Sequence, residues 1–298
     1  MIYYPRDTMP VTRNPPRLWR YIELTRLNRP IGVYLLLWPT LWALWMAAEG
    51  WPGWHLLLVF TLGTLLTRSA GCIVNDLTDM RFDGLVKRTK DRVLVTGQVD
   101  PIEAALVAGI ILFLALLLVL TTNIYTVTLS VFAVFIATIY PFMKRHTYLP
   151  QAILGIAFSW GIPMAFTAVG NEIPGIAWLL LIANLLWVMA YDTQYAMVDR
   201  DDDLRLGIKS TAILFADLDR HMIGILQVAF LLTMLLIPRT LDLSIWYYLG
   251  LSAGTGFFVY QHYLTWNRSR EGCFEAFLNN HWVGLCIFAG IFVHYVLN

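Results

Sequence analysis

The sequence predicts an all-α integral membrane protein, and three observations support this: the composition, the length of the apolar stretches and the one-sided distribution of basic residues. Of the 298 residues, 58% are hydrophobic and 14% are charged, and the mean hydropathy is +0.62. An ordinary water-soluble domain has fewer apolar and more charged residues. A helix that crosses a bilayer needs roughly 20 mainly apolar residues.

Nine apolar stretches approach that length, so the predicted fold has nine transmembrane helices. The stretches span about 31–48, 54–74, 102–121, 124–142, 150–169, 174–196, 212–237, 244–264 and 279–297. Pro39, Pro141 and Pro163 fall inside them and are expected to kink buried helices. Little chain remains for a soluble domain, so residues 1–298 are predicted to form a single integral-membrane domain.

Residues 1–29 precede the first apolar stretch and are rich in proline and arginine. They lack the apolar core of a cleaved signal peptide, so they are expected to be a retained cytoplasmic lead. With the N-terminus inside, 19 of the 21 basic residues lie on the cytoplasmic side, while Arg239 lies outside and Arg68 lies within a span. This distribution follows the positive-inside rule.

Two other classes of function find no support in the composition. A net charge of +1 provides no electrostatic surface for a nucleic acid. Cys72, Cys273 and Cys286 lie far apart, and the sequence has neither a CxxC pair nor a His/Cys pair at metal-ligand spacing. Disulfides and a zinc site are therefore not expected.

An acid-rich segment, CIVNDLTDMRFDG at residues 72–84, follows the second apolar stretch directly. At about 100° per residue, Asn75, Asp76, Asp79 and Asp83 share one face if the helix continues through the segment. A carboxylate at a membrane border loses favourable hydration, so a cluster of them on one face indicates a site.

A second acid-rich segment, YDTQYAMVDRDDD at residues 191–203, ends the sixth apolar stretch. Asp192, Asp199 and Asp203 lie within about 40° of one another on a helix, whereas Asp201 faces away. The predicted topology puts both acid-rich segments at the cytoplasmic ends of their spans. The two segments are therefore able to meet.

Clustered carboxylates repel one another unless cations lie between them. Oxygen ligands suit Mg²⁺, which commonly bridges carboxylates to phosphate groups. Basic residues that can neutralise phosphate oxygens follow both segments, at Lys87, Arg88, Arg92, Arg205 and Lys209. Taken alone, each acidic run is more typical of a solvated loop. Taken together, the two runs and their basic neighbours predict a site for a metal diphosphate.

Arg68 lies within the second apolar stretch, on the same predicted face as Asn75 and roughly 10 Å deeper in the membrane. A long cationic side chain in a span is also able to reach the interface by snorkelling. The face shared with Asn75 and Asp79 favours an inward position, where an intramembrane charge usually serves function.

The acidic segments resemble the two aspartate motifs of the UbiA-type intramembrane prenyltransferases. NDLTDMRFD matches the pattern NDxxDxxxD, and DTQYAMVDRDDD matches the second motif. RPIGVYLLLWPTLWALW, RSAGCIVNDLTD, YPFMKRHTYLPQ and GIKSTAILF resemble the branch of the family that acts on 4-hydroxybenzoate. The resemblance covers most of residues 26–215, and GCFEAFLNNHWVG near the C-terminus is similar but less diagnostic.

The resemblance implies nine helices around a central cavity, with cytoplasmic cap loops after helices 2 and 6. It implies Mg²⁺-dependent transfer of a polyprenyl group from polyprenyl diphosphate to the ring carbon ortho to the hydroxyl of 4-hydroxybenzoate. Diphosphate is released, and the product belongs to ubiquinone biosynthesis. The resemblance also implies a multi-pass protein of the bacterial inner membrane, in contact with lipid.

Matched motif by motif, the resemblance assigns roles to individual residues. The metal ligands would be Asn75, Asp79, Asp83, Asp199 and Asp203, and the four aspartates among them would be catalytic. The predicted substrate-binding set, which includes basic residues chosen by position alone, is Arg68, Asn75, Asp76, Lys87, Arg88, Arg92, Arg145, Asp192, Arg205 and Lys209. Arg68 would bind the acceptor carboxylate. Val93 departs from the family, which usually has proline there.

Three alternatives stay open at this point. Another aromatic acceptor, such as dihydroxynaphthoate, homogentisate or haem, would use the same chemistry, although the signatures of those branches are not seen. A secondary transporter of organic anions would use the intramembrane Arg68, but its site is expected near the midplane. An intramembrane phosphotransferase would share Asp79, Asp83, Gly84 and Arg88, but the downstream glycine and aspartate of its motif are absent.

Overall fold

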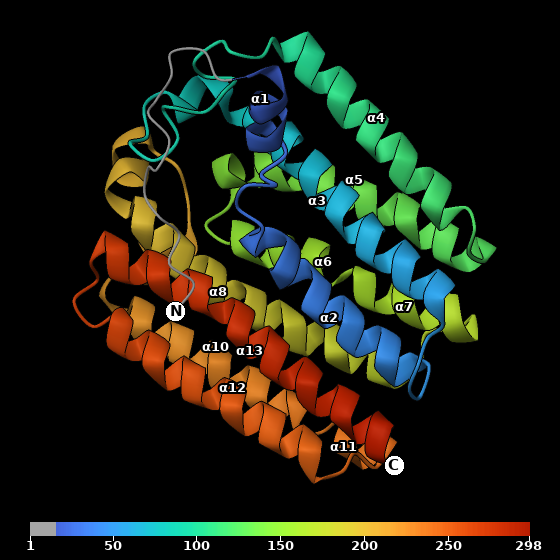
Figure 1. Ribbon diagram of the computed structural model, residues 1–298. Helices are drawn as coiled ribbons and strands as arrows, with labels where there is room; N and C mark the ends of the chain where they lie inside the picture. The colour runs from blue at the N-terminus through green and yellow to red at the C-terminus, as the bar shows by residue number, and fades with distance from the viewer. Residues whose placement is uncertain (1–15) are drawn as a thin grey trace.

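The computed structural model describes residues 16–298, apart from the side chains of residues 81, 82 and 144, and every regular element in that range is a helix (Figure 1). In chain order the helices are α1 (Arg17–Leu24), α2 (Ile31–Ala47), α3 (Trp54–Asp83), α4 (Pro101–Val119), α5 (Ile124–His146), α6 (Pro150–Ser159), α7 (Gly161–Gly170), α8 (Gly175–Leu206), α9 (Thr211–Phe215), the 3₁₀ helix η1 (Ala216–Leu218), α10 (Asp219–Met234), α11 (Pro238–Leu241), α12 (Ile245–Leu264) and α13 (Arg270–Leu297). The predicted all-α class is confirmed.

Each predicted apolar stretch corresponds to helix in the described part of the chain. Seven helical segments are long and apolar enough to cross a membrane. The other two predicted spans correspond to α2, an apolar helix of 17 residues, and α12, whose 20 residues include several polar side chains. A multi-pass membrane protein is therefore supported. Of the predicted N-terminal lead, residues 1–15 lie outside the described range, and the rest begins with α1.

The two helices that carry the acidic segments continue beyond their apolar stretches. α3 ends at Asp83, immediately before Gly84, and α8 ends at Leu206. Gly207 caps α8 in the left-handed conformation, with φ of 68°, and its N–H bonds the carbonyl of Asp203. Glycine adopts this conformation without the steric cost that a Cβ brings. Both acidic segments are therefore helical, as the prediction of shared faces requires.

Two of the predicted single spans are interrupted. The span predicted at 150–169 divides into α6 and α7 shortly before Pro163, whose ring clashes with the carbonyl four residues earlier and removes a helix hydrogen bond. The span predicted at 212–237 is broken at Ala216, which has a φ of 47°. No glycine or proline marks that second break in the sequence, so the apolar pattern did not predict it.

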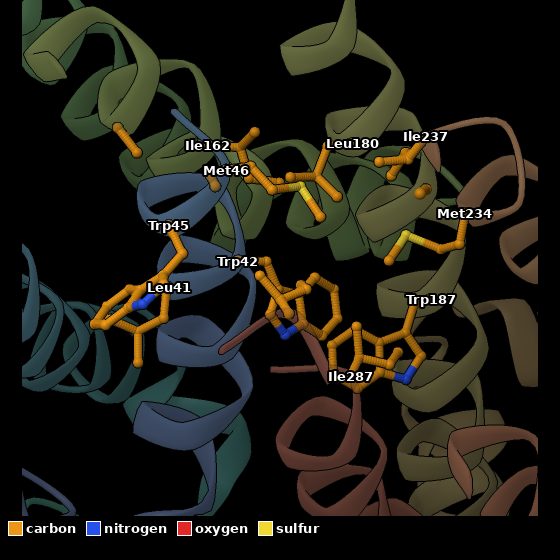
Figure 2. Close-up of a cluster of buried hydrophobic side chains, with 14 of the residues drawn as sticks. Leu41, Trp42, Trp45, Met46, Ile162, Leu180, Trp187, Met234, Ile237 and Ile287 are labelled. Atoms are coloured by element: carbon orange, nitrogen blue, oxygen red, sulfur yellow. The ribbon is translucent and has the colours of Figure 1, made fainter. Parts of the chain in front are cut away.

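The main hydrophobic core joins α2, α8 and α13 (Figure 2). The rings of Trp42 on α2 and Trp187 on α8 stack with their centroids 5.4 Å apart. A buried indole N–H needs an acceptor, and each finds one on α13: Trp42 bonds the carbonyl of Gly284 at 3.1 Å, and Trp187 bonds Asn280 Oδ1 at 2.9 Å. This core fixes α8, and therefore the second acidic segment, relative to the rest of the bundle.

Candidate active site

The first acidic segment places three buried carboxylates on the last turns of α3. Asp76, Asp79 and Asp83 are 2%, 9% and 7% exposed. Beside them, Asn75 is only partly buried as a residue, but its Oδ1 atom is buried and has no hydrogen-bond partner. A buried oxygen without a partner is costly, so this atom is available to a ligand that would contact it.

The segment that follows α3 supplies a counter-ion to these acids. Arg92 Nη1 lies 2.9 Å from Asp76 Oδ1, and the same atom makes a close ion pair with Asp83. Burial raises the pKa of the Asp83 carboxyl above its ordinary value, and the carboxylates of Asp76 and Asp79 add to this while Arg92 opposes it. The ionised form of Asp83 is therefore disfavoured by its surroundings, and a further cation bound here would stabilise it.

The second acidic segment is joined by a bidentate ion pair to the loop that follows the first. Arg88, in the segment after α3, donates from Nε to both oxygens of Asp199 at 3.1 Å and from Nη2 to Oδ2 at 2.5 Å. Its guanidinium carbon also lies 4.7 Å from the ring centroid of Tyr195, one turn earlier on α8. Two segments more than a hundred residues apart therefore converge at one end of the bundle, as predicted.

Neighbouring acids in the second segment have different environments. Asp202 is buried, bonds Arg270 Nη1 at 3.1 Å and lies close to the backbone of Lys87. The side chain of Asp201 is 70% exposed and lies 3.5 Å from Arg270. Asp199 is 9% exposed. The prediction that Asp201 faces away is confirmed. The contact of Asp202 with the first loop was not predicted, because it depends on the path of that loop.

A cavity of about 2440 Å³ extends from these ion pairs into the bundle. Its polar end is lined by Asn75, Asp76, Lys87, Arg88, Arg92, Asp192 and Asp199 among others, and apolar residues of α4, α5 and α7 line much of the rest. Asp79, Asp83 and Asp203 are not part of the lining in the described chain. Arg92 lines the cavity and forms an ion pair with Asp83. Asp83 therefore lies behind Arg92, which separates its carboxylate from the cavity.

Arg68 lines the same cavity, deeper than the acids. Its Nη1 donates to Cys72 Sγ at 2.6 Å, and its Nε is buried without a partner. The guanidinium lies against Gly32 of α2, where an added Cβ would be 2.2 Å from Nε. The predicted inward position is therefore observed, and the orphaned N–H is suited to an anionic ligand.

The remaining predicted basic residues lie outside the cavity lining. Arg145 is exposed and its Nη2 donates to the carbonyl of Thr78 at 3.3 Å, next to Asp79. Lys209 Nζ donates to the carbonyl of His146 at 3.4 Å and lies over the ring of Tyr148. Arg205 is exposed on the last turn of α8. These three are around the site, and none contacts the carboxylates of Asp83 or Asp199 in the described contacts.

One residue of the site was not predicted. Arg26, between α1 and α2, places its Nη2 atom 2.6 Å from Asp76 Oδ2. In the sequence, Arg26 is one of several basic residues predicted to be cytoplasmic, and nothing in the spacing of residues 17–31 shows that this segment folds back over α3.

The donor set suits a hard cation, although the carboxylates are paired with arginines. Within residues 16–298, no three or more His, Cys, Asp or Glu side chains form a group that could already hold a metal ion. The donors near the cavity are carboxylate and amide oxygens, including the unpartnered Asn75 Oδ1, and such oxygens are the ligands that Mg²⁺ prefers. The residues therefore fit Mg²⁺, provided that arginines give up part of their contacts.

Residues 36–285 match the profile of the UbiA prenyltransferase family. The chain belongs to this family. The UbiA relatives include the 4-hydroxybenzoate octaprenyltransferase of Pseudomonas entomophila, which is 53% identical over 287 residues, with 96% of this chain and 97% of the relative covered. The enzyme of the same name from Ectopseudomonas mendocina is 51% identical, with 99% of both chains covered.

Solved structures of UbiA homologues share the fold at lower sequence identity. The UbiA homologue from Aeropyrum pernix aligns with a TM-score of 0.78 and 23% identity, and the alignment covers 87% of this chain and 97% of that one. The UbiA homologue from Archaeoglobus fulgidus bound to GPP and Mg²⁺ aligns with a TM-score of 0.60 and 18% identity, covering 73% and 77%. At these identities the comparison supports the fold alone.

Proposed function

We propose that this protein transfers a polyprenyl group from polyprenyl diphosphate to the ring carbon ortho to the hydroxyl of 4-hydroxybenzoate, in ubiquinone biosynthesis. One observation carries the proposal: the ion pair of Arg88 with Asp199 joins the second acidic segment to the loop that follows the first, and Asp76, Arg88 and Asp199 line one large cavity. Relatives that are 51–53% identical over nearly the whole chain are named 4-hydroxybenzoate octaprenyltransferases. Their name makes octaprenyl diphosphate the first donor to test.

The polar end of the cavity is the proposed donor site. Asn75 and Asp199, which line it, would hold Mg²⁺ there together with Asp79, Asp83 and Asp203, which would have to turn toward the cavity. Bound Mg²⁺ would offset the negative charge that develops on the departing diphosphate. Lys87, Arg88 and Arg92 lie beside these acids and would bind the diphosphate oxygens. Two structures of a UbiA homologue from Archaeoglobus fulgidus are bound to Mg²⁺ together with GPP or DMAPP, which supports a metal-dependent donor site in this family.

Arg68 is the proposed anchor of the acceptor. Arg68 lines the cavity and its Nε has no hydrogen-bond partner, so its guanidinium would pair with the carboxylate of 4-hydroxybenzoate. An ion pair at that point would direct the phenol end of the ring toward the donor.

The bond changes follow from this placement of the two substrates. The C1–O bond of the allylic diphosphate breaks, and its electron pair leaves with the diphosphate. The ring carbon ortho to the phenol forms a bond with C1, and the ring then loses its proton and becomes aromatic again. The apolar walls on α4 and α5 exclude water, which would otherwise capture the allylic cation as an alcohol.

The proposed arrangement in the membrane completes the function. The chain would form a single domain of nine spans, in the bacterial inner membrane, with its N-terminus in the cytoplasm. The segments after α3 and α8 would act as caps over the donor site on the cytoplasmic side. Seven long apolar helices and the one-sided basic residues support this topology.

The direct test is product analysis with the purified protein in lipid nanodiscs. The protein would be incubated with Mg²⁺, 4-hydroxybenzoate and a mixture of polyprenyl diphosphates that includes octaprenyl diphosphate. We expect a 3-polyprenyl-4-hydroxybenzoate and one diphosphate per product, and neither when the metal is chelated. Failure to use 4-hydroxybenzoate while dihydroxynaphthoate is prenylated would contradict the proposed acceptor. Absence of diphosphate release with every acceptor would contradict prenyl transfer.

A further inference from the structure

The segment between α1 and α2 folds back over the first acidic segment and delivers Arg26 to it. Arg26 has a φ of 59°, in the left-handed region that non-glycine residues rarely adopt. Its Nη2 atom lies 2.6 Å from Asp76 Oδ2. A strained backbone persists only where its surroundings impose it, and here the docking of α1 imposes it.

Several contacts hold α1 in place at the end of α3. Leu24 is fully buried in a cluster with Val93 and Leu94 of the segment after α3 and with Ala104 of α4. Arg17 and Tyr21 bind Glu103 at the start of α4, and Arg20 donates to the carbonyl of Gln98. Figure 1 shows α1 beside the connection from α3 to α4, at the end of the molecule away from α11. The left-handed turn at Arg26 therefore follows from a docked helix.

Arg26 completes a row of four alternating charges. Asp76, only 2% exposed, receives Arg26 at 2.6 Å on one oxygen and Arg92 at 2.9 Å on the other, and Arg92 in turn contacts Asp83. A buried carboxylate needs a counter-ion. If Arg26 were absent, Arg92 would be the one arginine still paired with Asp76 among the residues that the structure describes, and the charge of Arg92 would be used to balance Asp76.

We infer that Arg26 is a positioning residue of the donor site: it shares the charge of Asp76 with Arg92, so that the guanidinium of Arg92 is not wholly engaged by Asp76 and also binds the diphosphate. This inference rests on the proposed function. It makes the segment before α2 part of the site, and it gives Asp76 the role of an anchor for two arginines.

The test measures binding of pyrophosphate in the presence of Mg²⁺, in addition to turnover. In Arg26→Gln we expect the Kd for magnesium pyrophosphate and the KM for the donor to rise about tenfold, because one partly buried ion pair is lost. The KM for 4-hydroxybenzoate should not change. Arg26→Gly removes the same charge while suiting the left-handed backbone, so it should bind pyrophosphate equally poorly without loss of thermal stability.

A double variant distinguishes charge balance from a structural role. If Arg26 acts by balancing Asp76, then Arg26→Gln with Asp76→Asn should bind pyrophosphate better than Arg26→Gln alone. A double variant that binds as weakly as the single variant, or more weakly, would overturn the inference. Arg17→Gln, which removes an exposed ion pair of the same helix, is the matched control and should bind pyrophosphate normally.

The outcomes separate this inference from the proposed function. If the unchanged protein fails to bind pyrophosphate with Mg²⁺, the proposed donor site is wrong. If the unchanged protein binds it, and both Arg26→Gln and Arg26→Gly bind it equally well, only the role of Arg26 is wrong.

Discussion

At the scale of single residues, the site depends on which neighbouring acids face the cavity. Asp199 points inward and receives Arg88, whereas the side chain of Asp201, two residues later, is 70% exposed. A helical turn of about 200° separates them. The sequence predicted this difference from helix geometry alone. It did not predict the partner of Asp199, because that contact depends on how the segment after α3 folds.

Exchanging each of these two acids for its amide tests the difference. We expect Asp199→Asn to lower kcat/KM by about 10²–10³-fold, the range for loss of a group that stabilises developing charge. Asp201→Asn should change it by less than about twofold, because exposed ion pairs contribute little. Initial rates of product formation with both substrates measure this, and the opposite ranking would contradict the helical assignment.

Gly32 makes room for Arg68, and this contact gives a second prediction. A Cβ at Gly32 would lie 2.2 Å from Arg68 Nε, so Gly32→Ala should displace the guanidinium. We expect the KM for 4-hydroxybenzoate to rise about tenfold, a loss of ~1.4 kcal/mol, while pyrophosphate binding stays unchanged. Arg68→Ala should act on the same substrate and more strongly.

Two comparisons make the Gly32 prediction specific. Gly109→Ala on α4, where an added Cβ meets nothing within 4 Å, should leave both substrates unaffected. In an Arg68→Ala background, Gly32→Ala should cause no further loss, because the side chain that it displaces is already gone. Equal loss of acceptor and pyrophosphate binding in Arg68→Ala would refute the acceptor role of Arg68.

At the scale of helices, hydropathy predicted where spans occur but not where helices end. α3 and α8 continue into the acidic segments because nothing there breaks a helix before Gly84 and Gly207. The break at Ala216 has a tertiary cause: Arg200 donates to the carbonyls of Ala212 and Ala216 and pairs with the buried Asp219 at 2.5 Å. Such contacts between α8 and α10 have no signature in local sequence.

Backbone strain at Ala216 leads to a prediction about stability. Its φ of 47° costs an L-residue roughly 1–2 kcal/mol relative to glycine. Ala216→Gly should therefore raise the Tm of the protein in detergent, measured by thermal unfolding. Ala212→Gly, in the short helix α9 and fully buried, is the matched control and should lower the Tm. A lower Tm in Ala216→Gly would show that the left-handed turn is not strained.

At the scale of the whole molecule, the apolar stretches and basic residues were sufficient to predict an all-helical membrane protein. The acid-rich segments, once read as helical, predicted that one end of the bundle carries a polar site. The contribution of α1 to that site was not predictable, because Arg26 and Asp76 are fifty residues apart and meet only through the docking of a helix on α3 and α4.

Removal of the metal tests whether the charges of the site are balanced by arginines or by a bound metal. Asp76, Asp83 and Asp199 are already paired with Arg26, Arg88 and Arg92, so these three carboxylates do not need a metal as a counter-ion in the folded protein. We expect chelation to abolish pyrophosphate binding while the Tm of the substrate-free protein changes little. A large fall in Tm on chelation would indicate a structural metal in place of one that enters with the diphosphate.

The central claim is that both acidic segments hold one metal diphosphate between them. Anomalous diffraction from crystals grown with Mn²⁺ and pyrophosphate tests it most directly, because it locates the metal independently of the protein. The account predicts metal peaks within ligand distance of the first segment, at Asp79 or Asp83 on α3, and also of the second segment, at Asp199 or Asp203 on α8. A single pyrophosphate is expected between the two segments. Metal and pyrophosphate bound by only one of the two segments would contradict it.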